Sequence, residues 1–113
     1  MSPGDIVLAR IAEARGGAKL RPTLLLRVMP GYGDFLVCGV SSQLRQAIAG
    51  FDEIVREGDE DFSASGLKVS SVVRLGHLAV LPRDYFFGKI GTVSEARLRR
   101  LLGNLIQYLG AED

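Results

Sequence analysis

Two polar residues at the ends of apolar runs, Arg21 and Ser41, are the side chains of this sequence best suited to holding an anion. A guanidinium is a planar, permanently charged fork that binds two oxygens at once, and a serine hydroxyl both donates and accepts hydrogen bonds. The same permanent charge makes arginine a poor proton donor or base. Taken alone, an arginine and a serine at strand ends are equally well explained as a solvated rim.

A β-hairpin is predicted to position this pair. Residues 23–28 and 35–40 form apolar runs, and residues 30–34 between them are rich in turn-forming types. Antiparallel pairing about a turn near Tyr32 requires the numbers of paired residues to have a constant sum. It places residue 21 opposite about residue 43, and residue 23 opposite about residue 41. Arg21 and Ser41 should therefore lie side by side at the open end of the hairpin.

Several further short strands predict a small barrel. Residues 4–11 are typical of a first strand, and residues 12–19 form a small, charged loop that ends at Arg21 and Pro22. Proline suits the first residue of a strand rather than its interior. Weaker strand patterns cover residues 51–55, 71–75 and 78–81, the last two separated by Gly76 and His77. The fold class predicted is mainly β with some α.

The C-terminal part of the sequence predicts an amphipathic helix. Its apolar residues recur at helical spacing: Leu98, Leu101, Leu102, Leu105, Ile106 and Leu109. Thr92 with Glu95, or Ser94 alone, is expected to cap the start, and Gly110 the end. The stripe should pack on the barrel or on a second subunit. A basic face, formed by Arg97 and Arg100, is too short for a membrane anchor.

Length and composition limit the classes of protein to which the chain can belong. The chain has 113 residues, 47% of them hydrophobic, which predicts one globular domain over residues 1–113. No apolar run is long enough for a membrane span and no signal peptide is visible, so we expect a cytoplasmic protein. Cys38, the single cysteine, lies in an apolar run and should serve packing. With one cysteine and one histidine there is no zinc site, and no cofactor is expected.

The charges are unevenly distributed, although the net charge is only +1. Residues 1–45 carry six basic and three acidic side chains, residues 46–66 one basic and six acidic, and the remainder seven basic and four acidic. If the acidic segment folds away from the open end of the hairpin, that end carries positive potential and can hold a polyanion. The simpler interpretation is that all these charges solvate the surface.

A series of short motifs covers nearly the whole chain and resembles the MazF/PemK family of toxin endoribonucleases. These motifs are Gly4-Asp5-Ile6-Val7, Lys19-Leu20-Arg21-Pro22, Val40-Ser41-Ser42-Gln43, Ser65-Gly66-Leu67-Lys68, Ser71-Val72-Val73-Arg74 and Ile90-Gly91-Thr92-Val93-Ser94-Glu95. The resemblance implies a compact SH3-like barrel with a C-terminal helix and a homodimer. It also implies metal-independent cleavage of single-stranded RNA to a 2′,3′-cyclic phosphate and a 5′-hydroxyl, blocked by a separate antitoxin protein.

The same resemblance assigns roles to individual residues. Arg21 matches the family's Arg-Pro arginine, and Ser41 its strand-end threonine, so both are expected to be catalytic. Arg74 matches a second arginine that works with an aspartate two residues later in one branch of the family, but Gly76 stands at that position. Either the base is then another group, His77 or Glu13, or the chain cleaves slowly, or it does not cleave.

Neighbouring residues are expected to help bind RNA. Ser42 and Gln43 follow Ser41 directly, and the glycine-containing loop before Arg21 carries Arg15 and Lys19. Because Gly76 and Ser41 both weaken the catalytic set, a non-catalytic module that binds nucleic acid or protein on the same barrel is the alternative.

Overall fold

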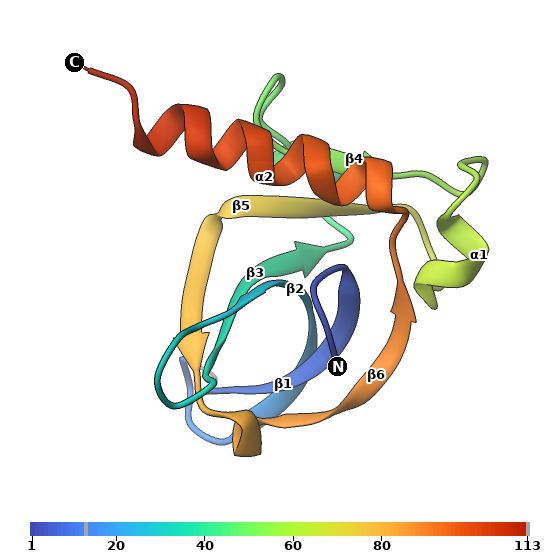
Figure 1. Ribbon diagram of the computed structural model, residues 1–113. Coiled ribbons are helices and arrows are strands. Elements are labelled where there is room, and N and C mark those ends of the chain that lie inside the picture. Colours follow the sequence, from blue (N-terminus) through green and yellow to red (C-terminus); the bar gives the residue numbers. More distant parts are fainter. Residues whose placement is uncertain (13, 113) are drawn as a thin grey trace.

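One antiparallel sheet, curled into a half-barrel, makes up most of the fold (Figure 1). The computed structural model describes residues 1–12 and 14–112. Within them six strands pair in the order β4-β5-β3-β2-β1-β6. Their bounds are β1 Asp5–Ala12, β2 Ala18–Val28, β3 Phe35–Ser41, β4 Glu53–Val55, β5 Ser71–Leu81 and β6 Phe86–Thr92. The predicted mainly β barrel-like fold with a C-terminal helix is confirmed; strand β6 was not predicted.

The predicted C-terminal helix is α2, Glu95–Leu109, which lies across β4 and β5 (Figure 1). Ser94 caps it, because its Oγ accepts a hydrogen bond from Arg97 N at 3.1 Å. Thr92 has a different role: its Oγ1 donates to Asp5 Oδ1 at 2.9 Å. Three further short elements were not predicted: α1 Phe62–Ser65, η1 Leu44–Gln46 and η2 Arg83–Tyr85. In the described chain no helix combines the length and the apolar character needed to cross a membrane.

Successive residues of the strands belong alternately to two hydrophobic clusters. Ile6, Leu24 and Cys38 belong to the cluster that also contains Leu101 and Leu105 of α2. Their neighbours along the strands, Val7, Leu25 and Val37, join Phe35 and Phe86 in the other. Period-two alternation therefore makes both faces of the sheet apolar over this region. Burial raises the pKa of the Cys38 thiol to about 12, with the Asp52 carboxylate adding to the effect, so this cysteine serves packing.

The hairpin register differs from the predicted one by two residues. Thr23 pairs with Gly39 rather than with Ser41, and an irregularity around Leu26 separates the Leu25–Val37 pair from the Arg27–Leu36 pair. A bulge of this kind adds one unpaired residue and accounts for one of the two. The other is already present on the turn side of the bulge, where Val28 pairs with Phe35. Continuing the observed register by two residues sets Arg21 opposite Ser41.

Pro22 lies inside a strand, contrary to the prediction that it would open one. Strand β2 begins at Ala18, so Lys19 belongs to the strand and not to the loop. The pairing of β2 with β3 ends at Thr23, and at Pro22 only β1 is paired with β2, through Leu8. A proline is tolerated there because β2 has one free side at this point.

Strand β5 bends sharply where a break was predicted (Figure 1). Cys38 pairs with Leu78, whereas the next residue of β3, Gly39, pairs with Arg74. Three residues of β5, ending with Gly76 and His77, therefore face no partner on β3. The predicted separation into two strands was wrong, because this bulge turns a single strand instead of ending it.

The acidic segment packs against the start of α2. Arg97 is buried there, and its guanidinium donates to Asp61, Glu53 and Asp59 at 2.8–3.0 Å. Hydrogen bonds from Arg97 lower the pKa of Asp61 to about 2. Arg100 also binds Glu53 at 2.8 Å. The predicted basic face of the helix is therefore wrong for Arg97, which neutralises the acidic segment instead of facing solvent.

Two of the motifs noted in the sequence cross one another. A Cβ added to Gly66, the residue after α1, would overlap Ile90 O, and a Cβ added to Gly91 would overlap the backbone of Ala64 and Ser65. Gly66 also has a φ of +74°, which favours glycine. These glycines allow α1 and β6 to approach backbone to backbone.

Candidate functional site

A groove of about 800 Å³ opens where the pairing between β2 and β3 ends, and we call it the hairpin groove. Its polar lining comes from four parts of the chain: Arg21, Ser41, Ser42, Gln43, Gln46, Lys68, Ser71, Arg74 and His77. Apolar walls include Leu8, Ile11, Val40 and Ile90. The groove thus combines anion-binding groups with surfaces that can contact planar, apolar groups.

Arg21 and Ser41 reach this groove from neighbouring strands. Arg21 pairs with Ala9 of β1 and its side chain is exposed, while Ser41 ends β3 and is half-buried. Ser41 Oγ accepts a hydrogen bond from Gln43 N at 3.1 Å. This bond uses a lone pair and leaves the hydroxyl proton to be donated to a ligand. Arg21 and Ser41 thus both line the groove, and each carries hydrogen-bond donors.

The floor of the groove is a row of residues on adjacent strands. Gly39 pairs with Thr23 on one side and with Arg74 on the other, and residues paired in this way share a face of the sheet. Gly39 provides no side chain, and His77 occupies the space beside it. A Cβ added to Gly39 would meet His77 Cβ at 3.3 Å and Nδ1 at 3.8 Å. The bend of β5 thus brings His77 over the middle of the row.

Two buried polar atoms of the groove have no hydrogen-bond partner within the described chain. They are Arg74 Nε, a donor, and Gln46 Oε1, an acceptor. Buried polar groups are nearly always hydrogen-bonded in folded proteins, so atoms of this kind are matched by a ligand or by water. Both residues line the hairpin groove, although these two atoms themselves are closed to solvent.

The charged side chains among the described lining residues of the groove are all basic. Arg21, Lys68 and Arg74 line it, and no carboxylate is among the lining residues that the structure describes. Three carboxylates of the acidic segment, Glu53, Asp59 and Asp61, are paired with Arg97 of α2 instead. No group of three or more His, Cys, Asp or Glu side chains in the described chain could hold a metal ion. The described groups favour binding of an anion through arginine, lysine and hydroxyl donors.

Not every predicted residue lines the groove. Arg15 and Lys19 are exposed in the β1–β2 hairpin and are not among the lining residues. Lys19 pairs with Ile11. Gln43 lines the groove, but its Oε1 already accepts from Arg45 Nη1 at 2.9 Å. Glu13 lies outside the described residues.

Several lining residues of the groove, among them Lys68, Gln46 and Gly39, were not assigned a role from the sequence. Lys68 was only part of a motif, Gln46 lay in a segment without a clear pattern, and Gly39 was one residue of an apolar run. A glycine within a strand does indicate close approach of another group, so Gly39 carried a signal. For Gln46 no sequence signal was available, because its place depends on how η1 packs on β5.

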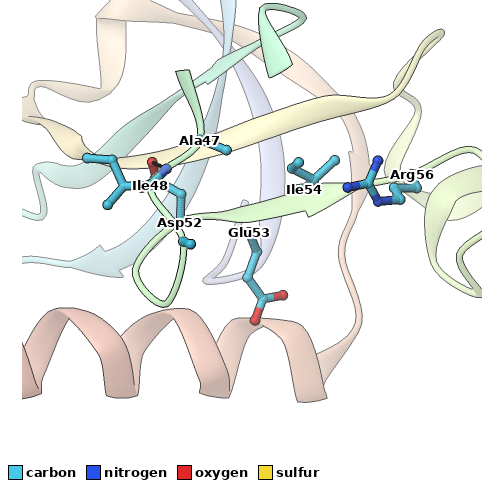
Figure 2. Close-up of a pocket in the computed structure, with 7 residues that line it drawn as sticks. Ala47, Ile48, Asp52, Glu53, Ile54 and Arg56 are labelled. Atoms are coloured by element: carbon cyan, nitrogen blue, oxygen red, sulfur yellow. Dashed lines mark hydrogen bonds between the residues drawn. The ribbon is translucent and has the colours of Figure 1, made fainter. Parts of the chain in front are cut away.

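A second hollow, of about 380 Å³, contains acidic residues (Figure 2). Its carboxylates hold the fold together. Asp52 accepts hydrogen bonds from Ile48 N at 2.9 Å and Leu75 N at 3.0 Å, and Glu53 pairs with Arg97 and Arg100. Figure 2 shows Glu53 directed toward the helix, with Ile48 at one end of the hollow and Arg56 at the other. Because Asp52 and Glu53 are engaged in these contacts, the role of this hollow is structural.

A third hollow, the helix-end groove, is mainly apolar. It has a volume of about 830 Å³ and is lined by Ile48, Phe51, Leu75, Leu78, Leu105, Tyr108 and Leu109. Close by on α2, Ile106 is 68% exposed, as are Tyr108 and Leu109. The C-terminal half of the predicted apolar stripe is therefore only partly covered by the chain itself.

Comparison with known proteins identifies the family. A comparison with curated proteins gives no match. The family described as the PemK-like, MazF-like toxin of type II toxin-antitoxin system matches residues 2–109, nearly the whole chain. This match agrees with the ordered motifs and with the barrel-like β fold. The chain belongs to the PemK-like, MazF-like toxin family of type II toxin–antitoxin systems.

Proposed function

We propose that this protein is a metal-independent endoribonuclease toxin that cleaves single-stranded RNA in the hairpin groove. Family membership implies a toxin–antitoxin endoribonuclease. The observation that supports this site most directly is the convergence of Arg21 and Ser41 on one groove with three cations and no carboxylate among its described lining residues. Such a groove attracts a polyanion and orients its phosphates.

The proposed reaction is an internal transfer at phosphorus. The 2′-oxygen of a nucleotide attacks the adjacent phosphate, and the bond from phosphorus to the 5′-oxygen breaks, leaving a 2′,3′-cyclic phosphate and a 5′-hydroxyl. Negative charge grows on the non-bridging oxygens during this step. Arg21 holds these oxygens, and the Ser41 hydroxyl donates to one of them. Fixed donors that meet developing charge are usually the largest single contribution to catalysis.

Arg74 supports the same phosphate from the far side of Gly39. Arg74 lines the groove and is half-buried, so its guanidinium adds positive charge beside the phosphate. The apolar walls, including Leu8 and Ile11, suit contacts with splayed bases of a single strand. Ser42 and Gln43 are exposed beside the groove, where they can hydrogen-bond to the RNA, whereas Gln46 is half-buried in its lining.

Two protein partners are part of this proposal. The first is an antitoxin that covers the hairpin groove and excludes RNA. The second is another copy of the chain, which covers the helix-end groove and the exposed Ile106, Tyr108 and Leu109. Exposed apolar side chains that are contiguous commonly mark an interface between proteins.

The competing function is a binding module without catalysis, and Gly76 is the residue that favours it. Gly76 stands where one branch of the family has an acid–base aspartate, and the groove has no described carboxylate to replace it. The two functions make different predictions about the RNA itself.

Incubation of purified protein with end-labelled single-stranded RNA in EDTA tests the proposal. We expect fragments with 2′,3′-cyclic phosphate and 5′-hydroxyl ends, which resist ligation until the 5′ end is phosphorylated. RNA that binds but stays intact would favour the binding module. Cleavage that EDTA abolishes would contradict the metal-independent mechanism.

A further inference from the structure

We propose that His77 is the catalytic base that accepts the proton of the attacking 2′-hydroxyl. This inference rests on the proposed endoribonuclease function and adds the group that its phosphate-binding residues do not provide. Arg21 and Arg74 are permanently protonated and cannot take up a proton. The reaction therefore needs a different side chain in the hairpin groove.

Two features of the chain place His77 in the hairpin groove. The bulge in β5 leaves residues 75–77 without partners on β3, so His77 is not part of the regular ladder. Gly39 then leaves room for the imidazole, whose Nδ1 lies 3.8 Å from the point that a Cβ on Gly39 would occupy. His77 lines the same groove as Arg21, Ser41 and Arg74, and it is exposed to an incoming strand.

The other lining groups can be excluded as bases by their chemistry. Lysine side chains such as that of Lys68 ordinarily carry a proton already, and the hydroxyls of Ser41, Ser42 and Ser71 are very weak bases. The amides of Gln43 and Gln46 do not take up protons in this range. An imidazole is the one side chain of the described lining that is commonly neutral and basic near pH 7.

The proton balance of the step is simple. As the 2′-oxygen bonds to phosphorus, its proton moves to a ring nitrogen of neutral His77. The bond between phosphorus and the 5′-oxygen breaks with its electron pair on that oxygen, which takes a proton from water. The resulting hydroxide removes the proton from His77, so the imidazole is regenerated and no other reactant is consumed.

Chemical rescue separates this role from a structural one. We expect His77→Gln to slow single-turnover cleavage about 100-fold or more, which is the usual contribution of a general base. We expect His77→Ala to be similarly slow, and added imidazole to restore a large part of its rate. Imidazole should leave His77→Gln unchanged, because the glutamine side chain fills the site. If His77 only packed beside Gly39, added imidazole would not restore the cleavage rate of His77→Ala.

Two further variants test the competing base and the local geometry. Glu13→Gln, with Asp84→Asn as a matched control on the exposed η2 turn, should cleave at the parent rate. Gly39→Ala places a methyl group 3.3 Å from His77 Cβ and should slow cleavage several-fold by displacing the imidazole. A strong loss in Glu13→Gln together with a parent-like His77→Gln would overturn the inference while leaving the proposed function intact.

The remaining outcomes are equally decisive. His77→Ala that imidazole does not rescue, although the variant is folded by circular dichroism, would also overturn the role of His77 as base. If the parent protein itself leaves single-stranded RNA intact, both the proposed function and this inference fail together.

Discussion

Asp61 and Arg97 form an ion pair that is almost closed to solvent. The Asp61 carboxylate accepts from Arg97 Nε at 2.8 Å and from Nη2 at 3.0 Å, and each side chain is only 7% exposed. The pair fixes the start of α2 to the acidic segment. Arg97 thereby compensates the negative charge of Asp61, which would otherwise weaken the positive potential of the hairpin groove.

Asp61→Asn is expected to destabilise the protein by about 3 kcal/mol, because it leaves the buried Arg97 charge only partly compensated. Urea unfolding followed by circular dichroism measures this change. Arg99→Gln is the control, since it removes an ion pair with Glu95 in which both side chains are more than 75% exposed. The control should unfold at nearly the parent urea concentration. Equal shifts in the two variants would contradict the role given to Asp61.

Acid should unfold the parent protein through the same carboxylate. The folded-state pKa of Asp61 is about 2, below its ordinary value of 3.8. A lowered pKa contributes stability that is fully present above pH 4 and is lost as the pH falls toward 2. By linkage the contribution is about 2 kcal/mol. Stability measured between pH 5 and 2 should therefore fall less steeply in Asp61→Asn than in the parent.

Gly91→Ala is expected to destabilise the fold by about 3 kcal/mol or more, since the added methyl group overlaps the backbone of Ala64 and Ser65. Gly103→Ala is a matched control within α2, where an added Cβ meets nothing within 4 Å. The control should be more stable than the parent by up to about 1 kcal/mol. Thermal unfolding of both variants measures the difference. A neutral Gly91→Ala would contradict the close crossing of α1 and β6.

Ser41→Ala should slow RNA cleavage about 10- to 100-fold, the value of one lost hydrogen bond to a charged group. Ser41→Thr keeps the hydroxyl and adds a methyl group that restrains its rotamer, so its rate should equal or exceed that of the parent. Ser2→Ala, at an exposed serine, controls for the substitution itself. Cleavage by Ser41→Ala at the parent rate would contradict a role of Ser41 in catalysis.

Tyr108→Glu should convert a dimeric parent into a monomer in sedimentation experiments, because it places a charge in the helix-end groove. Tyr32→Glu is the matched control, since Tyr32 is 95% exposed at the tip of the β2–β3 hairpin, outside that groove. It should leave the dimer intact. A monomeric parent, or a Tyr108→Glu variant that stays dimeric, would contradict the proposed interface.

Local patterns in the sequence predicted the parts of the fold that depend on local periodicity. The helical spacing from Leu98 to Leu109 identified α2, and the two apolar runs around Tyr32 identified the hairpin. The helical spacing arises because one face of α2 is buried, and the apolar runs arise because both faces of the sheet are buried there. Strand β6 was missed, since its glycines and exposed residues lack such alternation.

Features that depend on tertiary contacts could not be predicted in the same way. Nothing local distinguishes Arg97, which is buried among carboxylates, from Arg99, which is exposed. The bulge near Leu26 shifted the pairing of β2 and β3, and the shift depends on how both faces of the sheet pack. For the site, Arg21 and Ser41 came from hairpin geometry and resemblance, whereas Gly39 beside His77 required the structure.

The cleavage rate of Arg21→Ala tests the central claim most directly, because Arg21 is exposed and its loss should leave the fold intact. With single-stranded RNA in EDTA under single-turnover conditions, we expect the rate to fall about 100- to 1000-fold relative to the parent. Arg21→Lys should be intermediate, since it keeps the charge but loses the planar fork. An Arg21→Ala protein that folds and cleaves as fast as the parent would contradict the proposed site.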